Sequence, residues 1–188
     1  MEVARERIAL VNSYQTSSGS LNYWLIIDTV RVPDALEVLS QFAPFQNVFR
    51  LFATANLQHL IEHSPLVLNL GTDKAVLECL SFEDFDTSSV VFALDEQCDE
   101  EGFLVHLQQL FLAHIDSKPS VLRFYSGSFW QPIYQDLDDD DISTLLGPAR
   151  AVIWFANSER HQLDFLGAIT ALPQQPYVLM SDIFNTWV

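Results

Sequence analysis

The chain has 188 residues, 49% of them hydrophobic, and its 25 acidic and 9 basic residues give a net charge of −16. This length and apolar content suffice for one domain with a buried core and exclude a wholly disordered chain. The negative charge argues against nucleic acid and anionic membrane as partners, because both are themselves negatively charged.

Targeting and redox signals are absent from the sequence. No apolar run reaches the length of a membrane span, and residues 1–7 are charged rather than forming the apolar segment of a secretory signal. The two cysteines, Cys79 and Cys98, have neither metal-binding nor redox spacing. We therefore expect a single domain over residues 1–188 that resides in the cytoplasm and needs no cofactor.

Apolar periodicity predicts strands that alternate with helices. The predicted strands cover residues 23–30, 47–52, 65–70, 89–94, 121–125, 149–156, 161–165 and 177–180. The predicted helices cover residues 3–12, 35–42, 56–62, 73–80, 99–114, 129–137, 142–146 and 181–188. This alternation predicts an α/β fold with a mixed central sheet flanked by helices. A turn at residues 157–160 predicts an antiparallel hairpin near the C-terminus.

Two charged residues interrupt apolar strands. Asp28 lies in the strand predicted for residues 23–30, and Arg123 lies in the one predicted for residues 121–125. Since a buried unpaired charge is very costly, we predict that the two side chains interact and that their strands are neighbours or nearly so. The alternatives are that Arg123 reaches solvent at a strand end and that Asp28 caps the segment before Pro33.

Other polar residues have structural interpretations. The run Asp138–Asp141 fits a solvated loop and the N-cap of the next helix, and it lacks the spaced ligands and glycine turn of a calcium site. Ser126 and Ser128 flank a glycine as turn residues, since no base is evident for a nucleophile. His106 and His114 fall on the longest predicted helix.

One motif allows a metal site. His59-Leu60-Ile61-Glu62-His63 has the H-x-x-E-H pattern, in which two imidazoles one α-helical turn apart can bind zinc and the glutamate acts as base. The predicted helix is short and no later helix offers an obvious third ligand. Two exposed histidines are the simpler interpretation, and we expect no metal.

Several short blocks of sequence carry a resemblance to a known family. The blocks are Tyr23–Asp28, Arg50–Phe52, Ser64–Leu68, Leu122–Tyr125, Leu146–Pro148 and Trp154. In order and spacing they resemble the domain of unknown function 4123, a family that contains bacterial type VI secretion adaptors, also called effector chaperones. Leu122-Arg123-Phe124-Tyr125 matches its most recognisable motif. The resemblance extends over about residues 23–154, and the matching residues that we interpret as structural are Asp28, Arg123, Phe124, Tyr125, Gly147, Pro148 and Trp154.

The chain also departs from the family pattern. Ser126-Gly127-Ser128 replaces the aspartate-proline-arginine that normally follows the motif, and residues 53–55 stand where glycine is common. Longer adaptors carry a further C-terminal lobe, so we expect part of cargo recognition to be absent or reduced here.

The resemblance implies a protein that binds and does not catalyse. Such adaptors hold the N-terminal part of a toxic effector in the cytoplasm and help load it onto the secretion spike. We expect a heterodimer with an effector and contact with the spike protein, and the residues that bind them stay unassigned. The alternatives are an acidic immunity-type protein that inhibits a toxin and a zinc-dependent hydrolase that uses His59 and His63.

Overall fold

The computed structural model describes residues 20–41, 45, 47–54, 56–72, 77, 85, 87–165 and 175–187. The helix predicted for residues 3–12 lies outside these, as does the helix of residues 73–80 apart from Leu77. Cys79 also lies outside them. Within the described part of the chain, no helix is both long enough and apolar enough to span a bilayer.

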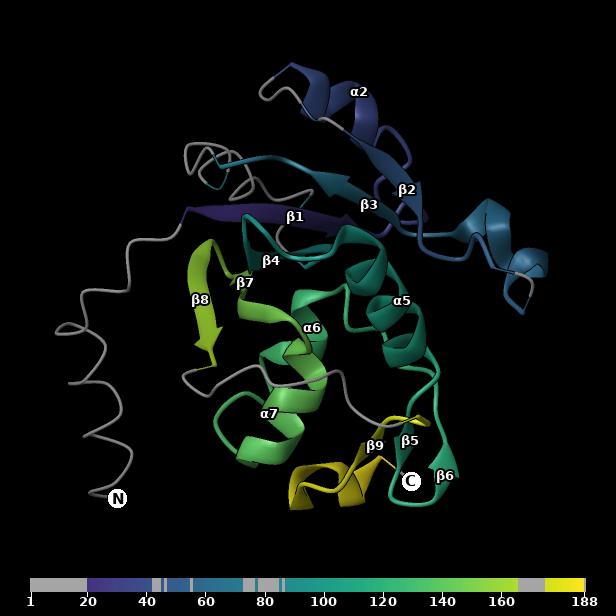
Figure 1. Ribbon diagram of the computed structural model, residues 1–188, viewed down its shortest axis with the longest axis vertical. Coiled ribbons are helices and arrows are strands. Elements are labelled where there is room, and N and C mark those ends of the chain that lie inside the picture. Colours follow the sequence, from purple (N-terminus) through teal and green to yellow (C-terminus); the bar gives the residue numbers. More distant parts are fainter. Residues whose placement is uncertain are drawn as a thin grey trace, which may run out of the picture.

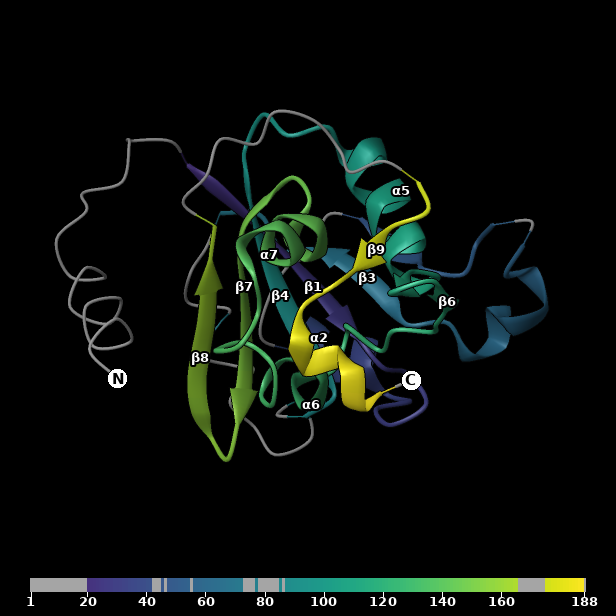
Figure 2. The same ribbon diagram turned by 90° about the horizontal axis from the view of Figure 1, so that it is seen from below.

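A six-stranded sheet forms the centre of the molecule, in the order β2-β3-β1-β4-β7-β8 (Figures 1 and 2). Each adjacent pair runs antiparallel. The strands are β1 (Leu21–Ile27), β2 (Val48–Arg50), β3 (Leu66–Asn69), β4 (Ser89–Asp95), β7 (Ala149–Ala156) and β8 (Glu159–Asp164). All were predicted, with bounds that differ by a few residues.

A small second sheet lies below the first in Figure 1 and brings the C-terminal segment against the middle of the chain. It has the order β6-β5-β9, with β5 at His114–Ile115, β6 at Lys118–Pro119 and β9 at Val178–Leu179. β5 and β9 are parallel, and they form the parallel pair among the described strands. The predicted α/β class is confirmed. The central sheet, which was predicted to be mixed, is antiparallel between all its neighbouring strands, and the parallel pair lies in the second sheet.

Helices cover both faces of the large sheet (Figure 1). One face carries α5 (Glu100–Phe111), α6 (Gly127–Trp130) and α7 (Asp139–Leu146), and the other carries α2 (Ala35–Ser40). The 3-10 helices are η1 (Gln58–His63) and η2 (Asp182–Thr186). The helix predicted for residues 99–114 ends at Phe111, so His114 lies in β5 instead.

The covered faces explain why the strands are apolar without alternation. Along β1, Trp24 and Ile26 enter the core under α5, whereas Leu25 and Ile27 enter the core on the α2 side. All four are almost fully buried. Since burying one such side chain stabilises the fold by roughly 2 kcal/mol, β1 holds the two layers together.

The predicted hairpin is confirmed and is tighter than expected. β7 and β8 pair from Ala156 and Glu159 outward, which leaves a loop of Asn157 and Ser158 alone. Both loop residues have positive φ, 55° and 62°. This is the backbone of a type I′ turn, whose twist matches that of antiparallel strands.

The strand predicted for Val121–Tyr125 is wrong. The segment is extended, with Val121 and Arg123 exposed and Leu122 and Phe124 buried, but it pairs with no described strand. Its backbone bonds go elsewhere: the Leu122 N–H donates to the carbonyl of Phe111 at 3.0 Å, and the indole Nε1 of Trp130 donates to that of Phe124 at 2.7 Å. A helix end and a tryptophan thus replace the neighbouring strand.

Candidate functional site

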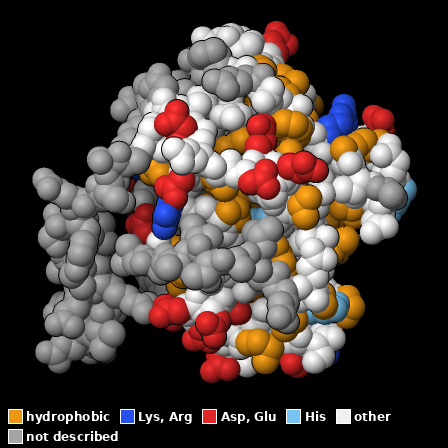
Figure 3. Space-filling view, in the orientation of Figure 1, with side chains coloured by type: hydrophobic (Ala, Val, Ile, Leu, Met, Phe, Trp, Pro, Cys, Tyr) orange, Lys and Arg blue, Asp and Glu red, His pale blue; other side chains and the backbone are white. Residues whose placement is uncertain are grey.

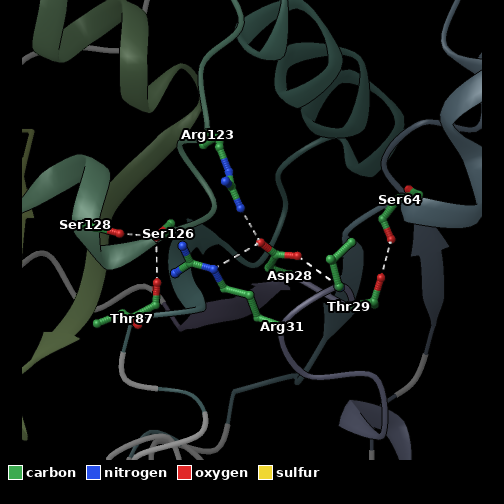
Figure 4. Close-up of polar contacts among 9 residues, drawn as sticks. Asp28, Thr29, Arg31, Ser64, Thr87, Arg123, Ser126 and Ser128 are labelled. Carbon is green, nitrogen blue, oxygen red and sulfur yellow. Dashed lines mark hydrogen bonds and ion pairs between the residues drawn. The ribbon is translucent and has the colours of Figure 1, made fainter.

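Asp28 is the centre of a polar cluster at the end of β1 (Figure 4). One carboxylate oxygen accepts the backbone N–H of Val30 at 3.0 Å. The other accepts Nη2 of Arg123 at 2.7 Å and lies 4.0 Å from Nε of Arg31. The predicted contact between Asp28 and Arg123 is confirmed, but the prediction that their strands are neighbours is wrong, because residues 121–125 form no strand. The alternative role for Asp28 is confirmed as well, because its side chain also caps the turn that follows the strand.

The two partners of this ion pair differ in exposure. The side chain of Asp28 is 4% exposed, whereas that of Arg123 is 53% exposed. Partial burial lowers the pKa of Arg123, but the hydrogen bond and charge of Asp28 outweigh this and the net effect raises it. The guanidinium also lies 5.9 Å from the ring centroid of Tyr125. Arg123 therefore covers a buried carboxylate while it stays charged and faces solvent.

Hydroxyl groups connect this cluster to another family block. Thr29 Oγ1 donates to the carbonyl of Ser64 at 3.0 Å. The Ser64 hydroxyl accepts the N–H of Phe52 at 2.9 Å and donates to the carbonyl of Pro65 at 2.9 Å. Sequence blocks near residues 28, 52, 64 and 123 thus meet at one end of the sheet. The sequence blocks alone did not indicate this convergence.

The motif residues beside Arg123 belong to the core. Leu122 and Phe124 are buried, and the ring of Phe124 packs edge-on against Phe92 at 6.3 Å between centroids. The Tyr125 side chain is also largely buried, which raises its pKa, although the nearby Arg123 opposes this. Within the motif, Leu122, Phe124 and Tyr125 therefore pack in the core, and Arg123 faces solvent.

The sequence model of a domain of unknown function family (DUF4123) matches residues 23–144. The chain belongs to the DUF4123 family. No curated protein and no solved structure matches the chain with significance. The resemblance found in the sequence is thus confirmed over the blocks from Tyr23 to Tyr125, whereas Gly147, Pro148 and Trp154 lie beyond the matched residues.

Trp154, in β7 of this DUF4123 chain, is held on all sides. Its indole Nε1 donates to Oε1 of Gln131 at 2.8 Å. Its ring stacks between Trp130 and His161, with centroids 6.1 and 5.6 Å away, and Tyr134 meets its edge at 5.3 Å. Trp154 is fully buried, so it joins the helical layer to the sheet and presents no surface to a partner.

Gly147 ends α7 beside a buried histidine. Its φ of +55° favours glycine, and a Cβ atom at this position would lie 2.4 Å from Cε1 of His106. The histidine needs that space because it lies fully inside the core, 3.1 Å from the Tyr177 hydroxyl through Nδ1. Sequence reasoning missed this pairing, since nothing local connects residues 106, 147 and 177.

Burial changes the protonation of both partners in this contact. Desolvation lowers the pKa of His106 from 6.5 to about 4, although a hydrogen bond to the Leu145 carbonyl opposes the shift. Burial raises the pKa of Tyr177. Both groups are therefore neutral near pH 7, and the contact between α5 and the C-terminal segment is a hydrogen bond between uncharged groups.

The acidic run ends in a buried carboxylate. Asp138 is the N-cap of α7, and Asp139 and Asp140 lie in its first turn, as the N-cap interpretation predicts. Asp141 is 3% exposed, so the solvated-loop interpretation is wrong for it. One of its oxygens accepts the N–H and hydroxyl of Ser181 at 2.7 and 2.6 Å. Asp141 thereby ties the C-terminal segment to α7.

The described residues show no catalytic site at either place that the sequence suggested, the His59–His63 motif or the Ser126–Ser128 turn. η1 is a 3-10 helix with three residues per turn, so His59 and His63 do not lie one turn apart on one face. Within the described ranges, no three His, Cys, Asp or Glu residues are grouped to hold a metal ion. Ser126 donates to the carbonyl of Thr87 at 2.6 Å and contacts the Ser128 hydroxyl at 2.6 Å, as a turn residue does.

The surface of the described residues carries shallow hollows. One of about 510 Å³ is lined by residues that include Asp95, Cys98, Pro148 and Arg150. Burial raises the pKa of the Cys98 thiol, and the charge of Asp99 raises it further. The thiol is therefore protonated near pH 7 and is a poor nucleophile or metal ligand.

Proposed function

We propose that this DUF4123 chain is an adaptor that binds the N-terminal part of a type VI secretion effector and helps load it onto the secretion spike. The observation that carries the proposal is membership of the DUF4123 family over residues 23–144. The sequence blocks resemble a family that contains such adaptors, and the proposal extends that role to this chain. The proposed adaptor acts in the cytoplasm, without catalysis or cofactor, as a heterodimer with its effector.

The roles of the family residues support a binding function. The motif at residues 122–125 builds the core and covers Asp28. These side chains give the fold its shape. Recognition of a partner then depends on the surface around them.

The composition of the surface is compatible with this function. Large apolar side chains stand exposed, among them Val30 at 61%, Val121 at 62% and Met180 at 63%. Acidic side chains are scattered over the face in Figure 3, where lysine and arginine are few. Apolar contacts can hold an effector segment, while the net charge of −16 keeps a complex soluble.

Co-expression with the product of the neighbouring effector gene tests the proposal. We expect a complex with one copy of each chain by size-exclusion chromatography with light scattering, and no complex when the N-terminal part of the effector is removed. Deleting the adaptor should abolish secretion of that effector while other effectors are still secreted. A soluble effector that ignores the chain and is secreted without it would overturn the proposal.

The net charge also supports a second candidate, an immunity-type protein that inhibits a basic toxin. The two functions differ in outcome. An inhibitor lowers the toxin's activity in the purified complex, and its binding weakens steeply with salt because long-range attraction drives it. An adaptor that engages only the N-terminal part of the effector leaves the activity of the toxic domain intact.

A further inference from the structure

The cluster around Asp28 has an unbalanced charge. Among the residues that the structure describes, two guanidiniums, of Arg31 and Arg123, share the one carboxylate of Asp28, so one positive charge is in excess there. Asp28 is the carboxylate partner of both arginines within the described part of the chain. Each arginine has five N–H donors. Arg123 uses one of them in its hydrogen bond to Asp28, and Nε of Arg31 lies 4.0 Å from the same carboxylate oxygen.

Both arginine side chains are partly open to solvent. The side chains of Arg31 and Arg123 are 46% and 53% exposed. Figure 4 shows the two side chains reaching Asp28 from different segments: a hydrogen bond of 2.7 Å holds Arg123, and Nε of Arg31 lies 4.0 Å from the same oxygen. Holding Arg123 in advance reduces the entropy that a ligand would otherwise have to remove on binding.

Apolar side chains flank both arginines. Val30 precedes Arg31 and is 61% exposed, and Val121 lies two residues before Arg123 and is 62% exposed. In the extended segment, Val121 and Arg123 are exposed while Leu122 between them is buried, so the two point outward together. The N–H of Val30 is fixed by Asp28. Each of the two arginines thus has an exposed valine within two residues along the chain.

We propose that Val30, Arg31, Val121 and Arg123, the Arg–Val surface, form the site where the effector's N-terminal segment docks. The proposal rests on the adaptor function proposed above. The segment would present an Asp or Glu carboxylate to the guanidiniums, and aliphatic or aromatic neighbours of that residue would cover the valines.

Charge selects this occupant over a basic or purely apolar one. A guanidinium pairs with a carboxylate through two parallel hydrogen bonds, and an apolar segment would leave the spare positive charge desolvated and unpaired. On a chain of net charge −16, the surrounding field repels acidic ligands at long range. The apolar contacts must therefore supply much of the affinity, which makes a mixed acidic and apolar segment the best fit.

The test uses the full-length chain bound to its effector. The double variant Arg31→Gln/Val121→Ser removes one guanidinium and one valine, both exposed, and spares Arg123 so that Asp28 stays covered. The matched control is Arg160→Gln/Val105→Ser, which removes an exposed arginine on β8 and a valine on α5 that is 39% exposed. Isothermal titration calorimetry measures the Kd of each complex.

We expect the test variant to weaken effector binding at least about tenfold and the control to change it less than about threefold. Equal binding by wild type and test variant would overturn the Arg–Val surface and leave the adaptor function intact. If the wild type binds no effector, the adaptor function fails. A second experiment, which uses no effector, then tests whether the Arg–Val surface binds a carboxylate with apolar neighbours.

That experiment records the arginine Nε–Hε NMR signals of the full chain with the peptide acetyl-Leu-Glu-Leu-amide. The signals of Arg31 and Arg123 should shift while that of Arg160 does not, and the glutamine analogue of the peptide should have little effect. Uniform shifts, or equal shifts with both peptides, would overturn the inference. So would a dimer of the free chain that the test variant abolishes, because a second copy would then be the occupant.

Discussion

At the scale of single residues, Arg123 shows how one side chain can stabilise the fold and face a partner. Its ion pair reaches a carboxylate that is 4% exposed, whereas another short ion pair of the described residues, between Arg150 and Asp95, is 43% and 47% exposed on its two sides. Water screens the second pair from both directions. The first pair neutralises a charge that would otherwise be buried alone.

Replacing each arginine with methionine separates these effects. We expect Arg123→Met to lower the free energy of unfolding by about 2 kcal/mol, because Asp28 then keeps only the N–H of Val30 and the 4.0 Å contact to the guanidinium of Arg31. Arg150→Met should cost less than about 1 kcal/mol, as exposed pairs do. Urea denaturation of both variants at pH 7 measures the difference. Equal losses would mean that the pair with Asp28 is only a surface contact.

Gly147 allows a second prediction at this scale. Gly147→Ala places a Cβ 2.4 Å from the His106 ring in a backbone conformation with φ +55°, so we expect a loss of about 3 kcal/mol in the free energy of unfolding. Introducing the same change into a His106→Ala background removes the steric clash and leaves the backbone strain. The cost there should fall to about 1 kcal/mol. Additive costs would contradict the steric explanation.

At the scale of elements, sequence periodicity predicted extended and helical backbone well but could not predict pairing. Residues 121–124 alternate exposed and buried positions as a strand does, yet a helix end and an indole satisfy their backbone. The two-residue strand β5 carries no periodic signal, and β9, which lies within the strand predicted for residues 177–180, carries none that identifies its partner. They form because His106 and Asp141 hold the C-terminal segment in place, through contacts between residues distant in sequence.

The candidate site was predicted in part for the same reason. Asp28 and Arg123 were paired from the sequence because each is a charge in an apolar segment, and burial cost alone connects them. Arg31 and Val121 were not singled out, since an exposed arginine and an exposed valine are unremarkable by themselves. Only their arrangement around Asp28 makes them a surface.

The contact between α5 and the C-terminal segment should depend on pH. The pKa of His106 is lowered from 6.5 to about 4, so between these values the unfolded chain binds a proton that the folded chain does not. The free energy of unfolding is therefore unaffected by this histidine above pH 6.5, and it decreases as the pH falls toward 4 because the unfolded chain takes up the proton. At about 1.4 kcal/mol per pH unit, the loss approaches about 3 kcal/mol.

His106→Gln removes this titration while it keeps a group that can bond to Tyr177. Urea denaturation of both proteins from pH 7 to pH 4 should show the wild type losing about 3 kcal/mol relative to the variant. The carboxylates titrate alike in both proteins, so their contributions cancel in the difference. A difference that stays constant with pH would show that His106 is not held neutral by burial.

At the scale of the whole molecule, two electrostatic effects act on stability in opposite directions: local ion pairs stabilise the fold, and repulsion among the many carboxylates destabilises it. The described residues form few close ion pairs, whereas the chain carries a net charge of −16. Salt weakens both effects, but repulsion acts among many exposed carboxylates and the strongest pair is partly shielded from solvent. Repulsion should therefore dominate the salt dependence of stability.

We expect the free energy of unfolding in urea to rise by about 1 kcal/mol or more between low salt and 0.5 M sodium chloride, where the screening length falls to about 4 Å. The variant Asp116→Asn/Asp136→Asn removes two exposed negative charges, and the asparagine suits the positive φ of residue 116. It should be more stable than the wild type at low salt and gain less from added salt. A wild type that loses stability with salt would mean that its ion pairs outweigh the repulsion. The acidic surface would then be no obstacle to binding the carboxylate of an effector.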